Sequence, residues 1–290
     1  MSKTRNNSGF VLILVLIVLA VAGTSLSLAA RRSGRQALRA SQAQQELQLA
    51  WGACSIRAAY LSQAERLLRQ QELQSDRPAI QTRRQLSLGG LTFDLLLADE
   101  QAKANVNVLD RKNKTVGLAR RLEVLQANMR YALHVDLRPA QVRAGDRAAR
   151  LYSSLDQLFD YSKPSQLVDF EYGEPGIIRR VTCWGNGKIN FKRAEPEVLR
   201  EVMAGVLTDA DVAALVKYRD ETPDCMLTEA VAALKIPREK VSALLEAMTD
   251  MSLCHSLWMS VTGKTRKWHR LYVDESDGGA AESRIWTFCW

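Results

Sequence analysis

Residues 10–30, FVLILVLIVLAVAGTSLSLAA, form an apolar run without a single charge. A helix needs about 20 such residues to cross the hydrocarbon core of a bilayer, so the run predicts a membrane-spanning helix. A short polar leader, MSKTRNNSG, precedes it and carries Lys3 and Arg5. A basic leader before an apolar run is also the pattern of a cleaved secretory signal, but the apolar core of such signals is usually about 7–15 residues long. The small-residue stretch suited to cleavage, 27–30, leads straight into Arg31 and Arg32, so we expect this segment to stay.

The helical pattern continues beyond the apolar run. Residues 31–73 contain no proline, and Pro78 is the first residue that forbids further helix. Apolar residues recur at close to helical spacing, and the stripe fails once, at Glu65. Its members are Ala43, Leu47, Ala50, Trp51, Cys54, Ala58, Leu61 and Leu68. We therefore expect an amphipathic continuation of the helix over residues 31–76, and at 1.5 Å per residue the whole helix would be ~95–100 Å long.

The basic charge of the chain is confined to its first third. Residues 1–90 hold 12 of the 40 Lys and Arg and 4 of the 32 Asp and Glu, so the remaining 200 residues are neutral. A nucleic-acid-binding globular part needs a basic surplus of its own, and this one has none. Four arginines (Arg31, Arg32, Arg35, Arg39) follow the apolar run and two basic residues precede it, so the positive-inside rule favours a cytoplasmic C-terminal side.

The order of leader, Gly9, Phe10 and apolar helix resembles a type IV pilin-like precursor. The resemblance implies that a prepilin peptidase cuts between Gly9 and Phe10 and that Phe10 becomes N-methylated. Most such proteins carry Glu at the fifth mature position, where this chain has Leu14. A carboxylate in lipid is costly unless it is paired, and in other pilins its partner is the N-terminal amine of the neighbouring subunit. Its absence resembles minor pseudopilin K of the type II secretion system (general secretion pathway protein K) and suits a subunit at the tip.

Two internal blocks carry the same resemblance. Residues 97–109, LADEQAKANVNVL, are similar to the DEQGK-x-N-x-N-x-L stretch of the K family, with Ala102 where glycine is usual. Residues 184–199, WGNGKINFKRAEPEVL, are similar to its G-x-I-N-x-N-T-A-x-x-x-V-L stretch, with Lys192 and Arg193 in place of Asn and Thr. The ordered set of leader, blocks and tail covers almost the whole chain.

This resemblance implies a structural, non-catalytic role in protein secretion through the outer membrane, at or near the tip of a pseudopilus. It implies a single-pass protein of the bacterial inner membrane with its globular part in the periplasm, against the positive-inside rule. The implied partners are other minor pseudopilins, the major pseudopilin, the inner-membrane secretion platform and the prepilin peptidase, and no nucleic acid.

Strand and helix signals alternate in the globular part. Residues 86–98 are rich in strand formers around a Gly89-Gly90 turn, and residues 177–191 predict a β-hairpin around Asn186-Gly187. The tail predicts strands at 257–262, 267–273 and 284–290, with turns at 263–264 and 278–279. Helices are predicted at 116–131, 140–152, 197–206, 212–220 and 239–248, with capping boxes at Ser154/Gln157 and Thr208/Asp211 and with Pro237 at a first helical position.

The resulting fold class is α+β, with a long N-terminal transmembrane and amphipathic helix and a small antiparallel, pilin-like sheet that holds an inserted helical, SAM-like region. We expect a prepilin leader at 1–9, the transmembrane helix at 10–30 and its amphipathic continuation at 31–76. The pilin-like α/β sheet would come from 80–110, 177–192 and 255–290. A first helical subdomain would occupy 111–176, and a second, SAM-like or helix-hairpin-helix-like, would occupy 193–254.

The helices at 197–206 and 209–220 also resemble a helix-hairpin-helix DNA module. That resemblance gives the alternative function of a membrane-anchored DNA-binding or DNA-uptake protein. Leu207 stands where the module has glycine, and the surrounding charge is balanced, so the packing role is favoured.

The sequence assigns no catalytic residue and no metal ligand. His134, His255 and His269 lack metal-ligand spacing, and neither a nucleophile elbow nor a P-loop is present, so we expect no enzyme and no cofactor. Calcium stays open, because pseudopilin families often bind it and three acidic clusters offer oxygen ligands. These clusters are Asp209/Asp211, Asp220/Glu221/Asp224 and Asp274/Glu275/Asp277.

Five widely spaced cysteines without a C-x-x-C pair argue against a zinc ribbon and against a dense disulfide framework. They are Cys54, Cys183, Cys225, Cys254 and Cys289. One bridge is compatible with an oxidising compartment, and the sequence does not select the pair.

Overall fold

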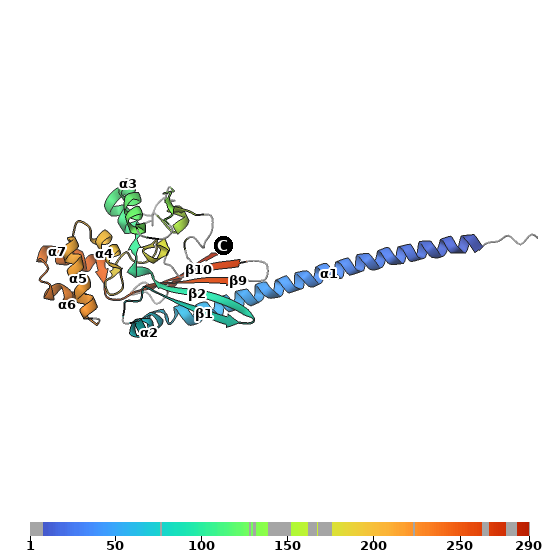
Figure 1. Cartoon of the computed structure of the whole chain (residues 1–290), viewed down its shortest axis with the longest axis horizontal. Helices are drawn as coiled ribbons and strands as arrows, with labels where there is room; N and C mark the ends of the chain where they lie inside the picture. Colours follow the sequence, from blue (N-terminus) through green and yellow to red (C-terminus); the bar gives the residue numbers. More distant parts are fainter. Residues whose placement is uncertain are drawn as a thin grey trace, which may run out of the picture. The chain divides into compact units, whose positions relative to one another are not determined.

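The computed structural model describes residues 8–75, 77–127, 129, 132–138, 152–161, 167, 176–222, 224–262, 267–276 and 283–289. It divides into two compact units, Met1–Cys54 and Ser55–Trp290, each described here by itself. The fold is α+β, as the sequence predicts, because a long apolar helix precedes a five-stranded antiparallel sheet and a set of shorter helices (Figure 1).

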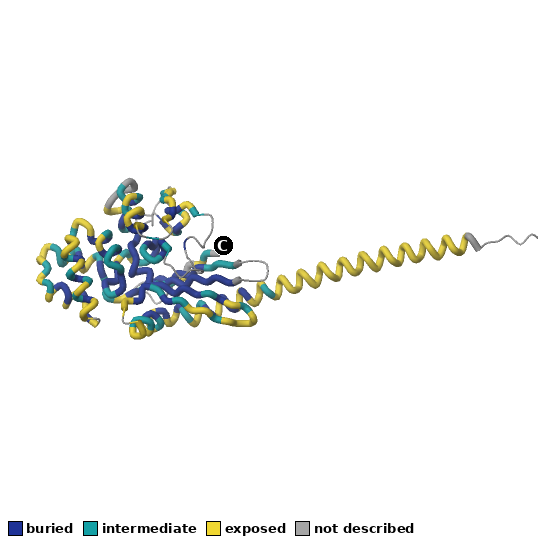
Figure 2. The backbone as a smooth tube through the Cα atoms, viewed as in Figure 1, coloured by how far each residue is buried: buried dark blue, intermediate teal, exposed yellow. Residues whose placement is uncertain are grey.

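The described part of the first unit is helical throughout. Helix α1 (Ser8–Leu61) runs through it and ends in the second unit. The apolar side chains of residues 10–30 are exposed along the whole run (Figure 2). The Thr24 hydroxyl donates to the Val21 carbonyl at 2.9 Å, so this polar group is satisfied within the helix itself. The predicted apolar helix is confirmed.

Helix α1 stops just after it enters the second unit. It ends at Leu61, and α2 (Ala64–Ser75) begins after the turn at Ser62 and Gln63. The Ser62 hydroxyl donates to the Ala58 carbonyl at 2.7 Å, a local bond of the kind that bends helices. The structure therefore has two helices where the sequence predicts one.

Five strands build the sheet of the second unit. They are β1 (Gln81–Leu88), β2 (Leu91–Asp99), β9 (Cys254–Thr262), β10 (Lys267–Ser276) and β11 (Ser283–Cys289), in the order β1-β2-β9-β10-β11 with every pair antiparallel. Gly89 and Gly90 close the first hairpin with φ of 61° and 78°, the left-handed values that a two-residue turn needs. This turn and the tail strands are confirmed.

The two faces of the sheet pack against different partners. Leu96 on β2 pairs with Trp258, and these side chains join the large core that the sheet shares with the helical region. The opposite face carries Leu97, which pairs with Leu257, and Tyr272. Arg57 in the last turns of α1 lies 5.6 Å from the centroid of the Tyr272 ring, so the helical segment before α2 shares that second face.

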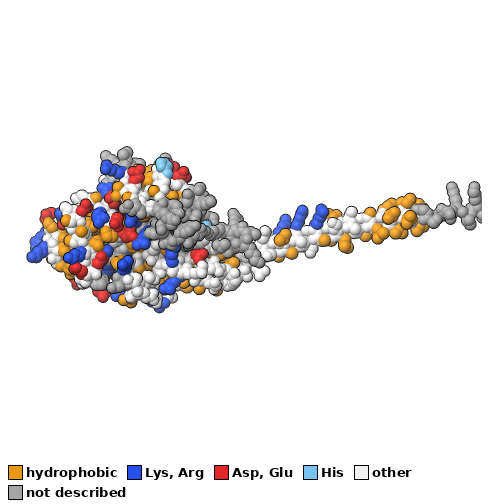
Figure 3. Space-filling view, in the orientation of Figure 1, with side chains coloured by type: hydrophobic (Ala, Val, Ile, Leu, Met, Phe, Trp, Pro, Cys, Tyr) orange, Lys and Arg blue, Asp and Glu red, His pale blue; other side chains and the backbone are white. Residues whose placement is uncertain are grey.

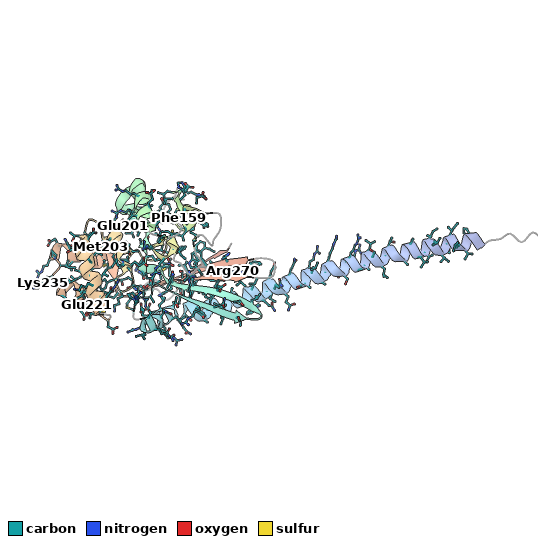
Figure 4. The ribbon with its side chains drawn as sticks, viewed as in Figure 1. Phe159, Glu201, Met203, Glu221, Lys235 and Arg270 are labelled. Atoms are coloured by element: carbon teal, nitrogen blue, oxygen red, sulfur yellow. The ribbon has the colours of Figure 1, made fainter. Side chains whose placement is uncertain are left out.

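The helical region contains four helices at one end of the sheet (Figure 1) and a longer one that precedes them in the chain. These are α3 (Val106–Gln126), α4 (Pro196–Met203), α5 (Asp209–Glu221), α6 (Leu227–Ala233) and α7 (Arg238–Ala247). Between α3 and α4 lie β4 (His134–Val135), β5 (Phe159–Asp160) and the 3₁₀ turns Leu155–Gln157 and Ile177–Arg179. Lys235 joins α6 to α7 with a positive φ of 51° (Figure 4).

The predicted hairpin at 177–191 is wrong. Strand β6 (Val181–Thr182) pairs in parallel with β3 (Ala104–Asn105), and β7 (Ile189–Asn190) pairs in parallel with β8 (Met248–Thr249). Among the described residues, 177–192 therefore contribute no strand to the five-stranded sheet. Gly185 and Gly187 do have positive φ, and the Asn186 side chain between them accepts a hydrogen bond from the Gln101 side chain.

The helix boundaries follow the capping residues. Helix α3 begins ten residues earlier than predicted, because the Asn105 side chain accepts from the backbone N–H of Asn107 at 3.0 Å. The Thr208/Asp211 capping box is confirmed, with reciprocal bonds of 3.0 and 3.2 Å, and the Ser154/Gln157 box opens the 3₁₀ turn. The sequence predicts Pro237 at the first helical position, but it is the N-cap residue of α7, which begins at Arg238. The predicted helix at 140–152, apart from its last residue, and the turns at 263–264 and 278–279 lie outside the described residues.

Candidate functional site

The apolar anchor comprises residues 10–30 of α1. Among the described residues, α1 is the one helix that is long and apolar enough to cross a membrane, judged by length and composition. Gly9 and Phe10 lie in its first turns, and Leu14 lies one turn further on. The side chains of Phe10 and Leu14 are both exposed. Cleavage after Gly9 and methylation of Phe10 stay predictions.

The second feature is an ion cluster around the buried Arg193 side chain, here named the Arg193 clasp, formed by Arg193, Glu65, Glu72 and Asp99. The Arg193 guanidinium donates to both oxygens of Glu65 at 2.7 and 2.8 Å. It also donates to both oxygens of Glu72 at 2.7 and 3.3 Å, and to Asp99 at 3.2 Å. The planar guanidinium suits such two-point pairing, so one side chain from the second sequence block ties α2 to the end of β2.

Asp99 is the most deeply buried member of the clasp. Its carboxylate is fully enclosed and also accepts from the Asn190 side chain at 2.9 Å and from the Ser252 hydroxyl. The backbone N–H of Gln101 donates to it at 2.9 Å. Every one of these donors compensates the removal of the charge from water, which a buried carboxylate requires.

The clasp shifts the ionisation of its members. Burial alone would raise the pKa of Glu65, but the neighbouring His255 and Arg193 side chains outweigh it and lower the pKa to about 2. Burial acts to lower the pKa of Arg193, and the bonds to Glu65 and Glu72 prevail and raise it. His255 Nε2 lies 3.4 Å from Glu65, which brings β9 to the same carboxylate.

The remaining polar residues of the two blocks hold the blocks together. Asn105 donates to the Trp184 carbonyl at 2.8 Å, and Asn107 donates to the Cys183 carbonyl at 3.1 Å. Glu100 and Lys103 form an enclosed ion pair, and Ser256 also donates to Glu100. These polar residues of the two blocks are therefore buried and form part of a buried polar network within the globular unit.

The loop between α4 and α5 joins the two helices that resemble a helix-hairpin-helix DNA module; in such a module, backbone N–H groups of this loop would contact a phosphate. The backbone N–H groups of Val206 and Leu207 both donate to the Met203 carbonyl, at 2.9 and 3.0 Å, at the end of α4 (Figure 4). Those two groups are therefore occupied within the loop. Glu201, on the same helix, pairs with Arg121 of α3 at 2.8 Å, so this region packs through internal contacts.

The candidate metal ligands are dispersed. Among the described residues, no group of three or more His, Cys, Asp or Glu lies close enough to hold a metal ion. Asp211 pairs with Lys240 at 3.0 Å, and its pKa is lowered first by the Thr208 backbone N–H and then by Lys240. Glu275 accepts from the Gly185 backbone N–H at 2.7 Å. Asp277 lies outside the described residues, and calcium binding stays a prediction.

The histidines and cysteines are distributed over several elements of the described structure. His134, His255 and His269 lie on three different strands, β4, β9 and β10. Cys225 and Cys254 are buried thiols, and burial raises the pKa of both, which opposes reactivity.

Sequence reasoning missed the clasp, although one signal pointed to it. Glu65 is the residue at which the apolar stripe fails, and Arg193 is one of the two residues, with Lys192, at which the second block departs from the K-family pattern. The two departures explain each other, because these side chains form a two-point ion pair.

Comparison with known proteins gives one similar structure to report. No family model and no curated protein matches the chain. A chain in the crystal structure of the GspK-GspI-GspJ complex from the type 2 secretion system of enterotoxigenic Escherichia coli is similar, with 13% sequence identity and a TM-score of 0.45. The match covers 86% of this chain and 99% of that chain.

Proposed function

We propose that this chain is a minor pseudopilin of a type II secretion system, anchored in the bacterial inner membrane with its globular unit in the periplasm. It takes a structural, non-catalytic part in the secretion of proteins through the outer membrane. The supporting observation is the anchor: the charge-free and exposed run of residues 10–30 follows Gly9 and lies within helix α1, which continues without a break to Leu61. A helix that only had to be cut away would need neither this length nor this continuity.

The internal blocks give independent support. They lie far apart in the sequence, and the buried network joins them through side-chain bonds such as Asn190 to Asp99 and Gln101 to Asn186. Residues that resemble a family pattern therefore have a shared physical role in folding the globular unit. The occupied backbone N–H groups of the α4–α5 loop favour this reading over the alternative of a DNA-binding protein.

The absence of a carboxylate at Leu14 supports a position at the tip of the pseudopilus. A shaft subunit needs a group that pairs with the amine of the next mature subunit, and a subunit with no neighbour beyond it does not. The partners of such a subunit are other minor pseudopilins below it, the major pseudopilin, the secretion platform and the prepilin peptidase.

Processing provides the decisive test. Mass spectrometry of the membrane fraction should find a mature protein that begins with N-methylated Phe10 and retains the apolar helix. The variant Gly9→Leu is the matched control, because it alters the residue before the cut and leaves the helix intact, and it should accumulate with its leader. A mature N-terminus near Arg31 would mean ordinary signal cleavage and would overturn the proposal.

A further inference from the structure

A one-sided cluster of arginines follows the apolar anchor. It consists of Arg31, Arg32, Arg35 and Arg39, here named the arginine stripe, and all four side chains are exposed on α1. A helix turns by about 100° per residue, so Arg35, Arg39 and Arg32 lie about 40°, 80° and 100° around the axis from Arg31. The four guanidinium groups therefore share one arc. Figure 3 shows the blue side chains along the edge of α1 beyond its orange apolar end.

No acidic residue lies within the segment of α1 that carries the stripe. No Asp or Glu occurs from Phe10 to Gln45, and the first is Glu46, about two turns beyond Arg39. The arc opposite the stripe carries small uncharged residues, among them Ser33, Ala37 and Ala40. The segment 31–40 of α1 therefore presents four positive charges on one side and no charge on the other.

The height of the stripe matches the headgroup layer of a membrane. If residues 10–30 cross the hydrocarbon core, Arg31 to Arg35 lie within about 8 Å of its edge at 1.5 Å per residue, and each headgroup layer is about 5–7 Å thick. Arg39 lies about 13–14 Å from the edge of the hydrocarbon core. It is therefore beyond the headgroup layer, but by less than the Debye length of about 8 Å. All four charges are thus within reach of lipid phosphates.

The residue type points to phosphate in particular. All four cations are arginines, whose planar fork pairs with two phosphate oxygens at once, whereas lysine offers only a point charge. We propose that the arginine stripe binds the phosphate headgroups of anionic phospholipids in the leaflet next to the anchor. The proposal rests only on residues 10–30 spanning a membrane and not on the role in secretion.

This interaction resolves a conflict in the sequence. The positive-inside rule opposes placing four arginines on the periplasmic side. Anionic headgroups paired with the stripe would neutralise that charge locally, so the orientation proposed above no longer leaves four uncompensated cations at the outer leaflet.

Native mass spectrometry of the full chain released from lipid nanodiscs tests the proposal. The bilayer would be phosphatidylcholine with about one phosphatidylglycerol in twenty lipids. Each arginine near the membrane surface raises the affinity for anionic lipid about fivefold. We expect phosphatidylglycerol to be enriched at least fivefold among the lipids that leave with the wild-type protein. Enrichment should fall to about that of the bulk bilayer when all four arginines are changed to glutamine, and it should weaken in high salt.

Two matched variants make the result specific. The first changes four exposed arginines of the second unit to glutamine and should keep the enrichment; these are Arg66, Arg77, Arg84 and Arg238. The second changes the stripe to lysine, keeps the charge and should retain part of the enrichment. Enrichment that is equal in the wild type and the glutamine stripe variant, or that is lost only in the control of the second unit, would overturn the proposal. Because processing at Gly9 is read out separately, failure here would leave the proposed function standing.

Discussion

Replacing Arg193 with methionine should destabilise the globular unit severely. Methionine keeps much of the side-chain length and removes all five guanidinium bonds to Glu65, Glu72 and Asp99. Breaking a buried ion pair costs about 3–5 kcal/mol, because the partner charge remains buried. The side chains of Arg193 and Asp99 are 4% and 0% exposed, so this range applies to their pair.

The expected magnitude lies at the lower end of that range. Asp99 keeps the bonds from Asn190 and from the Gln101 backbone, which still stabilise its charge. The Glu65 side chain is 55% exposed, so water takes over most of its solvation and its pair adds less than about 1 kcal/mol. We therefore expect a loss of about 3 kcal/mol, or a melting temperature lower by about 6–12 °C for a unit of this size.

Thermal unfolding of the full chain in detergent would measure this loss. The fluorescence of Trp184 and Trp258 would report on the globular unit, because both rings are buried in its core. Arg66→Met is the matched control, since Arg66 is exposed on the same helix α2, and it should change the stability by less than about 0.5 kcal/mol. A change below about 1 kcal/mol for Arg193→Met would refute the view that the clasp holds α2 to the sheet.

Three further changes probe other parts of the chain. Because the pKa of Glu65 is lowered from 4.5 to about 2 in the folded state, its contribution is present above pH 4.5 and disappears as the pH falls toward 2, so wild-type stability should fall more steeply with acid than that of Glu65→Gln in parallel denaturation curves. Gly187→Ala should destabilise more than Gly205→Ala in the same assay: both residues have positive φ, worth about 1–2 kcal/mol, but only at Gly187 does a new Cβ meet Val108, at 2.6 Å. Leu14→Glu should reduce membrane insertion, with a cost of about 2.5–3.5 kcal/mol on insertion scales, and long homopolymers of this variant in electron micrographs would contradict the tip position.

The sequence predicted correctly those elements that are determined by residues close together in the chain. The Gly89-Gly90 turn, the Thr208/Asp211 capping box and the tail strands depend on residues that are neighbours in sequence, and all are present. The apolar anchor depends on composition alone, so it could be predicted from the sequence equally well. These features need no knowledge of distant contacts.

The errors arose where distant partners decide the structure. Strands β6 and β7 are two residues long and pair in parallel with β3 and β8, whose residues lie about 60–80 positions away, so the Asn186-Gly187 signal for a local hairpin was misleading. The Arg193 clasp joins three segments of the chain, and the sequence shows only that Glu65 and Arg193 are each unusual. Only the folded structure shows that these two unusual residues are ion-pair partners.

The geometry of the clasp has a mechanical consequence. The backbone from the apolar run of residues 10–30 enters the globular unit through the end of α1 and then α2, so any pull on that run reaches α2 through covalent bonds. Glu65 and Glu72 stand two helical turns apart, and one guanidinium holds both. A force along the axis of α2 would therefore load both ion pairs at the same time, in shear, rather than peel them apart one after the other. Such an attachment resists extraction more strongly than a single contact and can re-form once the tension is released.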